Sequence, residues 1–236
     1  MTTTTLQGVV RKESFPAAFW EGLWRSAGLQ SAGLFAVAAF LFGLQPAIGA
    51  SAESVANFYD GERLQILAAA SVAGLATLNL MWFSAAVRTE IETNARGGWG
   101  GAVTASAGAA GALLLLFAAT IALLAYAAAD LGAAGLMKAG NDFAWTTLVL
   151  SSFPRAMVIM SCSFGLWRSK VISNGLFTLC VFALLAVLAG GTTWARDGVW
   201  APDGIYSREI SPAITLVWLV IASALLLRRA PTAKTW

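Results

Sequence analysis

Arg155 is the residue whose type and position point most directly to chemistry. It lies about twelve positions from each end of an apolar stretch, residues 143–167, that is long enough to cross a membrane. An arginine at that depth costs about 2.5 to 3.5 kcal/mol on insertion scales, so an intramembrane charge is by default a functional hypothesis. Arg155 is therefore our first candidate for binding a substrate anion or a lipid phosphate.

Pro154, immediately before Arg155, predicts a kink or a break in the same helix. Proline lacks a backbone N–H, and at this position it frees the carbonyl of Leu150. Ser151 and Ser152, one turn earlier, can satisfy part of the freed backbone. Some transporters use a broken helix with a cation at mid-membrane to hold an anionic group, and this stretch has the residues for that arrangement.

Asn79 is the other polar residue deep in an apolar stretch. Such side chains commonly hydrogen-bond across helices, so we expect Asn79 to be a neighbour of Arg155. No Asp or Glu lies inside any expected span, and a purely structural role for Arg155 stays open. In that role its five N–H groups would bind the Leu150 carbonyl, Asn79, serines or water. The candidate binding residues are thus Arg155, Asn79, Ser151 and Ser152.

The residue types that most catalytic sites need are missing or lie outside the apolar stretches. The chain has no His, which excludes His-ligated zinc, haem with two His ligands, and hydrolases of the Ser-His-Asp or Cys-His kind. All four Lys lie outside the expected spans, which argues against a Ser–Lys protease. Without Asp, Glu or His inside the membrane, proton-coupled transport is not expected either.

Two further pairs of residues are weaker candidates for a catalytic or redox role. Asp130 and Asp142 bracket one external loop and could form an aspartyl pair, but eight acidic residues lie on that side in any case. Cys162 and Cys180 lie on consecutive spans without a CxxC motif, so we expect them to be packing residues. We predict a protein that is not an enzyme and that has no metal ion or cofactor.

The composition determines which elements must position these residues. Hydrophobic residues make up 58% of the 236 positions, charged residues only 11%, and the mean hydropathy is +0.72. Because a soluble domain has about 25% charged residues, we predict an all-α polytopic membrane protein. Six apolar stretches are long enough to span, namely residues 28–50, 64–87, 102–129, 143–167, 173–195 and 213–227.

The distribution of charge predicts the orientation of these six helices. Ten basic residues lie on the side of the two termini and four on the other, whereas four acidic residues lie on the first side and eight on the second. The two sides therefore have net charges of +6 and −4, and the positive-inside rule places both termini in the cytoplasm. Arg155, inside a span, adds one positive charge and brings the total to +3. This net charge then reflects topology, and no nucleic-acid partner is expected.

Three regions follow from this topology. Residues 1–27 form a cytoplasmic or interfacial N-terminal segment, residues 28–229 the transmembrane bundle, and residues 230–236 a cytoplasmic tail. Phe15, Phe19 and Leu23 share one helical face, which predicts a short helix lying in the headgroups, although a partner-docking helix has the same pattern. A signal peptide cleaved before Glu53 is the alternative to an uncleaved first span.

Small residues in the third stretch predict close helix packing. Thr104, Gly108 and Ala112 are spaced by four, and so are Ala107 and Gly111. Small residues at this spacing allow helix backbones to approach closely within one chain, and the same pattern can form a homodimer seam.

Two external loops are expected to lie over the outer end of the bundle. The first, residues 51–63, predicts a short amphipathic helix with Val55, Phe58 and Tyr59 facing the bundle. The second, residues 197–212, contains a Pro-Asp-Gly turn signal. A lid formed by both loops is one interpretation, and loops that are acidic because they are external is the other.

Three short motifs give the chain a family resemblance. Residues 57–63 (NFYDGER), 153–157 (FPRAM) and 201–204 (APDG) resemble those of small six-helix bacterial membrane proteins with domains of unknown function, often from high-GC genomes. The resemblance implies a multi-pass protein of the bacterial plasma membrane and implies no substrate.

Together these observations lead to a functional expectation with two alternatives. The first expectation is a six-helix protein in the lipid bilayer that binds or passes a small anionic or lipidic molecule near Arg155. The second is an accessory subunit whose helices serve a membrane complex or a homo-oligomer, and the third is a membrane-embedded enzyme.

Overall fold

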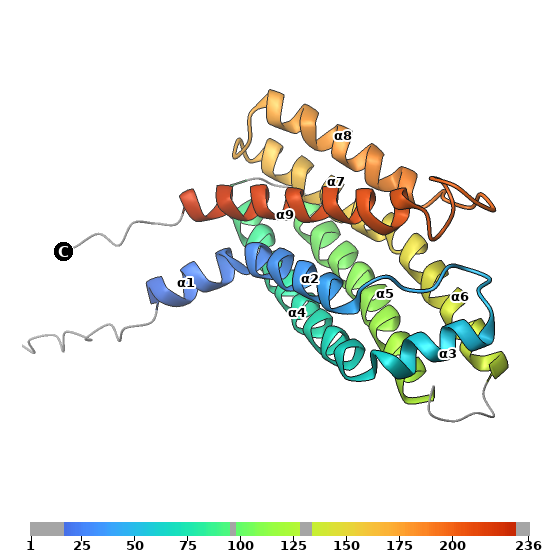
Figure 1. Cartoon of the computed structure of the whole chain (residues 1–236). Helices are drawn as coiled ribbons and strands as arrows, with labels where there is room; N and C mark the ends of the chain where they lie inside the picture. Colours follow the sequence, from blue (N-terminus) through green and yellow to red (C-terminus); the bar gives the residue numbers. More distant parts are fainter. Residues whose placement is uncertain (1–16, 95–97, 128–133, 230–236) are drawn as a thin grey trace, which may run out of the picture.

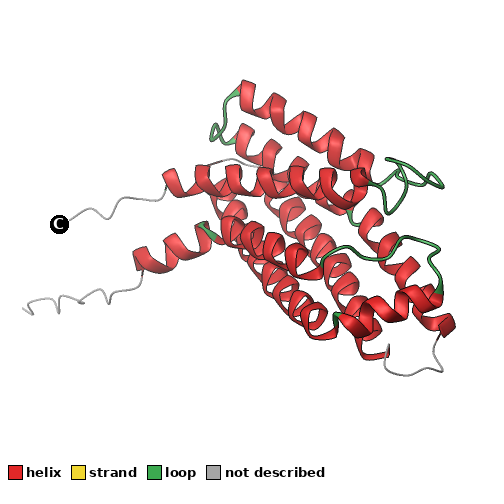
Figure 2. Cartoon of the chain, in the orientation of Figure 1, coloured by secondary structure: helices red, strands yellow, loops and turns green. Residues whose placement is uncertain are grey.

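A computed structural model of the chain describes residues 17–94, 98–127 and 134–229, and this part is helical without any strand (Figure 2). The apolar composition leaves backbone groups no partner but each other inside a membrane, and a helix satisfies them within one segment. The helices are α1 (Ala17–Arg25), α2 (Ala27–Phe42), α3 (Ala52–Gly61), α4 (Arg63–Asn94), α5 (Trp99–Ala127), α6 (Ala134–Leu150), α7 (Ser152–Arg168), α8 (Asn174–Gly190), the π-helix η1 (Tyr206–Ile210) and α9 (Ser211–Arg228).

Four helical segments in the described part are long and apolar enough to cross a membrane. They are Arg63–Thr93, Trp99–Ala127, Gly135–Arg168 and Tyr206–Arg228. The apolar helices α2 and α8 have 16 and 17 residues, about 24 to 26 Å of helix, which is less than the roughly 30 Å of a hydrocarbon core. The long apolar helices indicate a multi-pass membrane protein.

The first and fifth predicted helices end earlier than their apolar stretches. The helix expected over 28–50 ends at Phe42, because Gly43 has a φ of 70° and Pro46 cannot continue a helix. The helix expected over 173–195 ends at Gly190, where Gly191 and Thr192 form a turn. Both predictions extended too far, because the few charges after each helix do not mark where the helical backbone ends.

The helix predicted around Arg155 is bent and much longer than expected. Helices α6 and α7 form one segment, Gly135–Arg168, with a single non-helical turn residue at Ser151 (Figure 1). The Ser151 amide still donates to the Thr147 carbonyl (2.9 Å), and the Arg155 amide to the Ser151 carbonyl (3.1 Å). Pro154 therefore accompanies a kink in a continuous hydrogen-bonded path, and the broken helix that was the other prediction is not formed.

Helix α5 lies in the middle of the bundle, against α4, α6 and α7 (Figure 1). A Cβ atom on Gly111 would lie 3.1 Å from the side chains of Met81 and Thr77, so this glycine permits the close contact of α5 with α4. The other predicted row, formed by Thr104, Gly108 and Ala112, does not pack inside the bundle, so this prediction was wrong. Thr104 and Ala112 are exposed, and Gly108 has open space around it, because α5 turns that face away from its neighbours.

The amphipathic helix predicted in the first external loop is confirmed as α3. Ser51 accepts a hydrogen bond from the Ser54 amide and so caps its N-terminus. Val55 and Tyr59 are fully buried against α5 and α6, and Phe58 meets Phe42 edge to face, with ring centroids 6.1 Å apart. Helix α3 thereby closes a second hydrophobic cluster, separate from the main one.

The chain between α2 and α3, residues 43–51, is held against α6 by side-chain hydrogen bonds. The Asn141 amide donates to the carbonyls of Pro46 and Ala47, both at 3.2 Å, and accepts from Gln45 Nε2 (3.1 Å). Trp145 Nε1 donates to the Pro46 carbonyl as well (2.8 Å). These bonds give the carbonyls of Pro46 and Ala47 side-chain donors where α2 has ended and helical hydrogen bonds are missing.

Helices α1 and α9 meet at the opposite end of the bundle from α3 (Figure 1). Arg25 forms an ion pair with Glu90 (3.3 Å) and donates to the Leu226 carbonyl (3.2 Å), while Ser223 Oγ donates to the Arg25 carbonyl (2.8 Å). Helical hydrogen bonding passes from α1 to α2 through the turn at Ser26, so α1 continues α2 with a small bend. The C-terminal end of α1 therefore lies beside the C-terminal end of α9.

Candidate functional site

The side chain of Arg155 lies on the first turn of α7, beside α9, and only 5% of the residue is exposed. Its Nη2 donates to Ser152 Oγ (2.8 Å), its Nε to the Ser151 carbonyl (3.3 Å), and its Nη1 to Thr215 Oγ1 (3.4 Å). These three bonds account for three of the five N–H groups of a guanidinium. The other two have no acceptor among the residues that the structure describes.

The positive charge of Arg155 is also uncompensated. The ion pairs of the described residues are Arg25 with Glu90, Arg88 with Glu92, and Arg208 with Glu209, and none of them includes this guanidinium. All three partners of Arg155 are neutral oxygen atoms. A buried charge without an opposite charge is unfavourable, so an anion beside Arg155 would be stabilised.

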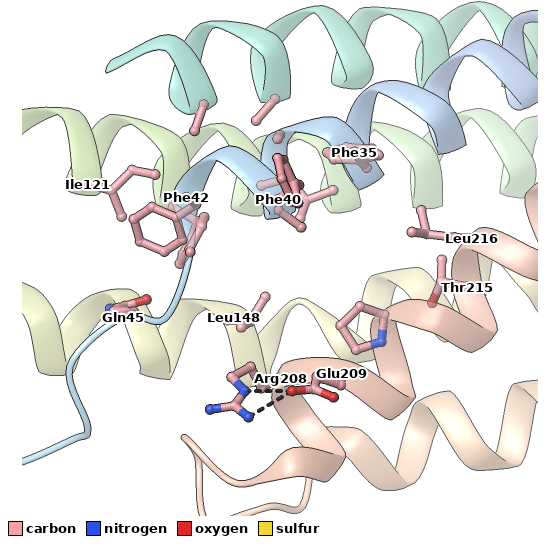
Figure 3. Close-up of a pocket in the computed structure, with 18 of the residues that line it drawn as sticks. Phe35, Phe40, Phe42, Gln45, Ile121, Leu148, Arg208, Glu209, Thr215 and Leu216 are labelled. Atoms are coloured by element: carbon pink, nitrogen blue, oxygen red, sulfur yellow. Dashed lines mark hydrogen bonds and ion pairs between the residues drawn. The ribbon is translucent and has the colours of Figure 1, made fainter. Parts of the chain in front are cut away.

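Arg155 lines a cavity of about 450 Å³. The walls come from α2, α4, α5, α6 and α9 and from the segment just after α2, and all but five of the 21 lining residues are apolar. The five are Gln45, Arg155, Arg208, Glu209 and Thr215. Figure 3 shows Phe35, Phe40 and Phe42 on α2 across an open space from Thr215 and Leu216 on α9. The volume lies within the range of about 300 to 1,000 Å³ that is typical of small-molecule sites.

The rim of the cavity carries a second arginine that is already paired. Arg208, on η1, donates to Glu209 Oε1 from Nε (3.1 Å) and from Nη2 (2.7 Å), as Figure 3 shows. The pair is exposed at the surface, so its net contribution to stability is small. Because Glu209 neutralises Arg208, the uncompensated cation of the cavity is Arg155.

A buried hydroxyl without a partner lies next to this cluster. Ser211, the first residue of α9, is fully buried, and its Oγ has no hydrogen-bond partner among the described residues. Ser211 Oγ and Ser152 Oγ lie 2.6 and 2.9 Å from the position that a Cβ on Gly190 would occupy, so both hydroxyls lie against this glycine of α8. The guanidinium of Arg155 and these hydroxyls form one polar cluster inside an apolar bundle.

The structure brings together some of the predicted site residues and separates others. Ser151 and Ser152 both bind Arg155, through a carbonyl and a hydroxyl respectively. The carbonyl that binds Arg155 belongs to Ser151, whereas we expected that of Leu150. Asn79 was wrongly predicted as a neighbour, because its amide donates to the Leu75 carbonyl of its own helix (3.0 Å) and it does not line the cavity.

Thr215 and Ser211 are site residues that the sequence reasoning missed. They lie four positions apart, so they share one face of α9, and Thr215 Oγ1 donates to the Ser211 carbonyl (3.0 Å). This spacing in an apolar stretch was a usable signal for a polar site. Nothing in the sequence indicated that this face of α9 meets α7, where Arg155 lies 60 residues before Thr215.

The structure describes three of the four residues in the two weaker candidate pairs. Asp130 lies outside the described residues, and Asp142 accepts the Gly49 amide (2.8 Å), so the aspartyl pair stays a prediction. Cys162 and Cys180 are buried free thiols, as expected of packing residues.

Comparison of the chain with models of protein families, with curated proteins and with solved structures found no match.

Proposed function

We propose that this protein is an integral membrane protein that binds a small anionic or lipidic molecule in the cavity beside Arg155, without catalysing a reaction. One observation supports this proposal above the others. Arg155, which is only 5% exposed and has no carboxylate partner among the described residues, lines an apolar cavity of about 450 Å³. An anion in the cavity would supply the missing charge and accept the remaining N–H groups.

The proposal includes six membrane crossings with both termini in the cytoplasm of a bacterium. Helices α2 and α8 are short, but each is apolar and packs beside a long neighbour, α4 for α2 and α7 for α8. The contact of Arg25 with the end of α9 supports an even number of crossings. The excess of basic residues near this end supports its cytoplasmic location, and the motif resemblance supports a bacterial plasma membrane.

Native mass spectrometry from mild detergent tests the binding proposal. We expect the wild-type protein to retain an adduct that Arg155→Gln loses, because glutamine keeps a polar side chain and removes the charge. Arg168→Gln is the matched control, because Arg168 is exposed and forms no ion pair among the described residues. Thermal unfolding of each variant confirms that it is folded.

Two results would contradict the proposal. An adduct retained equally by the wild type and Arg155→Gln would show that Arg155 does not hold it. A bare mass for the folded wild type, together with a stable stoichiometric partner chain, would favour the accessory-subunit alternative.

A further inference from the structure

The apolar lining residues of the cavity that are exposed lie on α2 and on the segment just after it, and this exposed part of the lining is the apolar opening of the cavity. Helices α2 and α9 are in contact and diverge towards the segment 43–51 (Figure 1). At the wider end, the lining residues Phe40 and Leu44 are 82% and 73% exposed. Large apolar side chains with this exposure on a membrane protein face lipid chains. The opening therefore gives access from the bilayer interior.

The charge of the site favours a ligand with a single negative charge. Arg155 contributes one uncompensated positive charge, and a carboxylate matches it and accepts two N–H groups side by side. A phosphate monoester has a charge of about −1.5 to −2 at pH 7. Part of that charge would remain uncompensated in an apolar cavity, which is unfavourable.

The apolar walls can accommodate a hydrocarbon chain attached to this head group. Phe35, Phe42 and Phe117 lie along the cavity together with Ile121 and Leu148. A chain that moves from the bilayer into such walls gains little free energy, because lipid is as apolar as the protein interior. Selective binding must then come from the head group at Arg155, and removing the charge is expected to weaken binding more than changing the walls.

From these observations we propose that the ligand is a single-chain lipid carboxylate, a long-chain fatty acid in its ionised form, that reaches the cavity from the bilayer between α2 and α9. Its carboxylate binds Arg155 and its chain lies along the aromatic side of α2. This inference rests on the proposed function and adds to it the class of ligand and the route of access.

Photolabelling in phosphatidylcholine nanodiscs tests the ligand, with palmitate that has a diazirine in mid-chain as the probe. We expect labelled peptides from α2 and α9 in the wild type, and labelling reduced at least about tenfold in Arg155→Gln, the loss expected for a charge-assisted hydrogen-bonded pair. Arg168→Gln should label as the wild type does. Hexadecyl phosphate should compete less well than unlabelled palmitate, because its extra charge has no partner.

The route is tested by a pair of substitutions on α2. Ala39 lines the opening, and Val37 is exposed on another face of the same helix and does not line the cavity. We expect Ala39→Phe to slow labelling severalfold by filling the opening, whereas Val37→Phe leaves the rate unchanged. Equal rates in both variants would contradict access between α2 and α9.

A water-soluble carboxylate separates failure of this inference from failure of the proposed function. If benzoate binds in an Arg155-dependent manner and palmitate does not label the cavity, the anion site is real and the lipid inference is wrong. If neither probe depends on Arg155, both are wrong. Labelling that dioleoyl phosphatidylglycerol suppresses better than palmitate would likewise overturn the single-chain carboxylate.

Discussion

The hydrogen-bond partners of Arg155 come partly from its own stretch of chain and partly from another helix. Ser151 and Ser152 lie three and four positions before Arg155, so helical spacing alone puts them within its reach. Thr215 reaches it only through the packing of α9 on α7. The guanidinium binds three neutral oxygen atoms in all, and this is why the position has a charge available for an anion.

Tyr59 is a second buried polar residue, and it gives a prediction about stability. Its hydroxyl has no hydrogen-bond partner among the described residues, and burial raises the pKa of the phenol. A buried donor without a partner costs about 1 to 3 kcal/mol, so Tyr59→Phe should stabilise the protein by about 1 kcal/mol in thermal unfolding. Tyr206→Phe, which removes a 2.8 Å bond to the Ala186 carbonyl, should destabilise it.

The same residue predicts a pH dependence. Above about pH 10 the phenol ionises in the unfolded chain, while the raised pKa keeps it protonated in the fold. The unfolded state then binds fewer protons, and stability falls as the pH rises. Between pH 7 and about pH 11, Tyr59→Phe should therefore lose less stability than the wild type. A parallel loss in both proteins would contradict the burial of this hydroxyl.

The side chain of Asn141 forms three of the hydrogen bonds that hold residues 43–51, the segment after α2, against α6. Asn141 binds Gln45 and the carbonyls of Pro46 and Ala47. Asn141→Ala would remove these bonds and leave Gln45 Nε2 without its acceptor. The Pro46 carbonyl would keep its bond from Trp145 and the Ala47 carbonyl its bond from the Ala50 amide, so we expect a loss of about 1 to 2 kcal/mol. Faster amide hydrogen exchange over residues 43–51 should accompany it, measured by mass spectrometry.

Asn79→Ala is the control for this prediction. It removes the same side-chain type, but the bond it removes is to the Leu75 carbonyl within one helix. We expect a change within about 0.5 kcal/mol and unchanged exchange over residues 43–51. Equal effects of the two substitutions would show that Asn141 does not hold this segment in place.

The topology of the whole molecule can be tested by the accessibility of single cysteines. Cys162 and Cys180 are buried, and replacing both with Ser gives a background without thiols. Ala47 and Ser173 are exposed at opposite ends of the bundle. In intact cells, a membrane-impermeant maleimide should label Ala47→Cys and spare Ser173→Cys, and permeabilised cells should show both. The reverse pattern would contradict cytoplasmic termini.

The all-helical class, the buried face of α3 and the kink before Arg155 were all predictable from the sequence, because each depends on local chemistry. Apolar composition demands helices, the spacing of Val55 and Tyr59 defines one face, and Pro154 removes one helical hydrogen bond. The buried cation was visible for the same reason, since a charge in an apolar stretch stands out wherever the helix packs.

The tertiary structure alone decided which faces of the helices meet. Both small-residue rows of α5 had the right spacing, yet Gly111 packs on α4 while Thr104 and Ala112 face outward. Asn79 turned out to bond within its own helix, and Thr215 to complete the site. The physical reason is that lipid and protein interior are equally apolar. Hydrophobic periodicity, which marks the buried face of a helix in water, has no such meaning when every face is apolar.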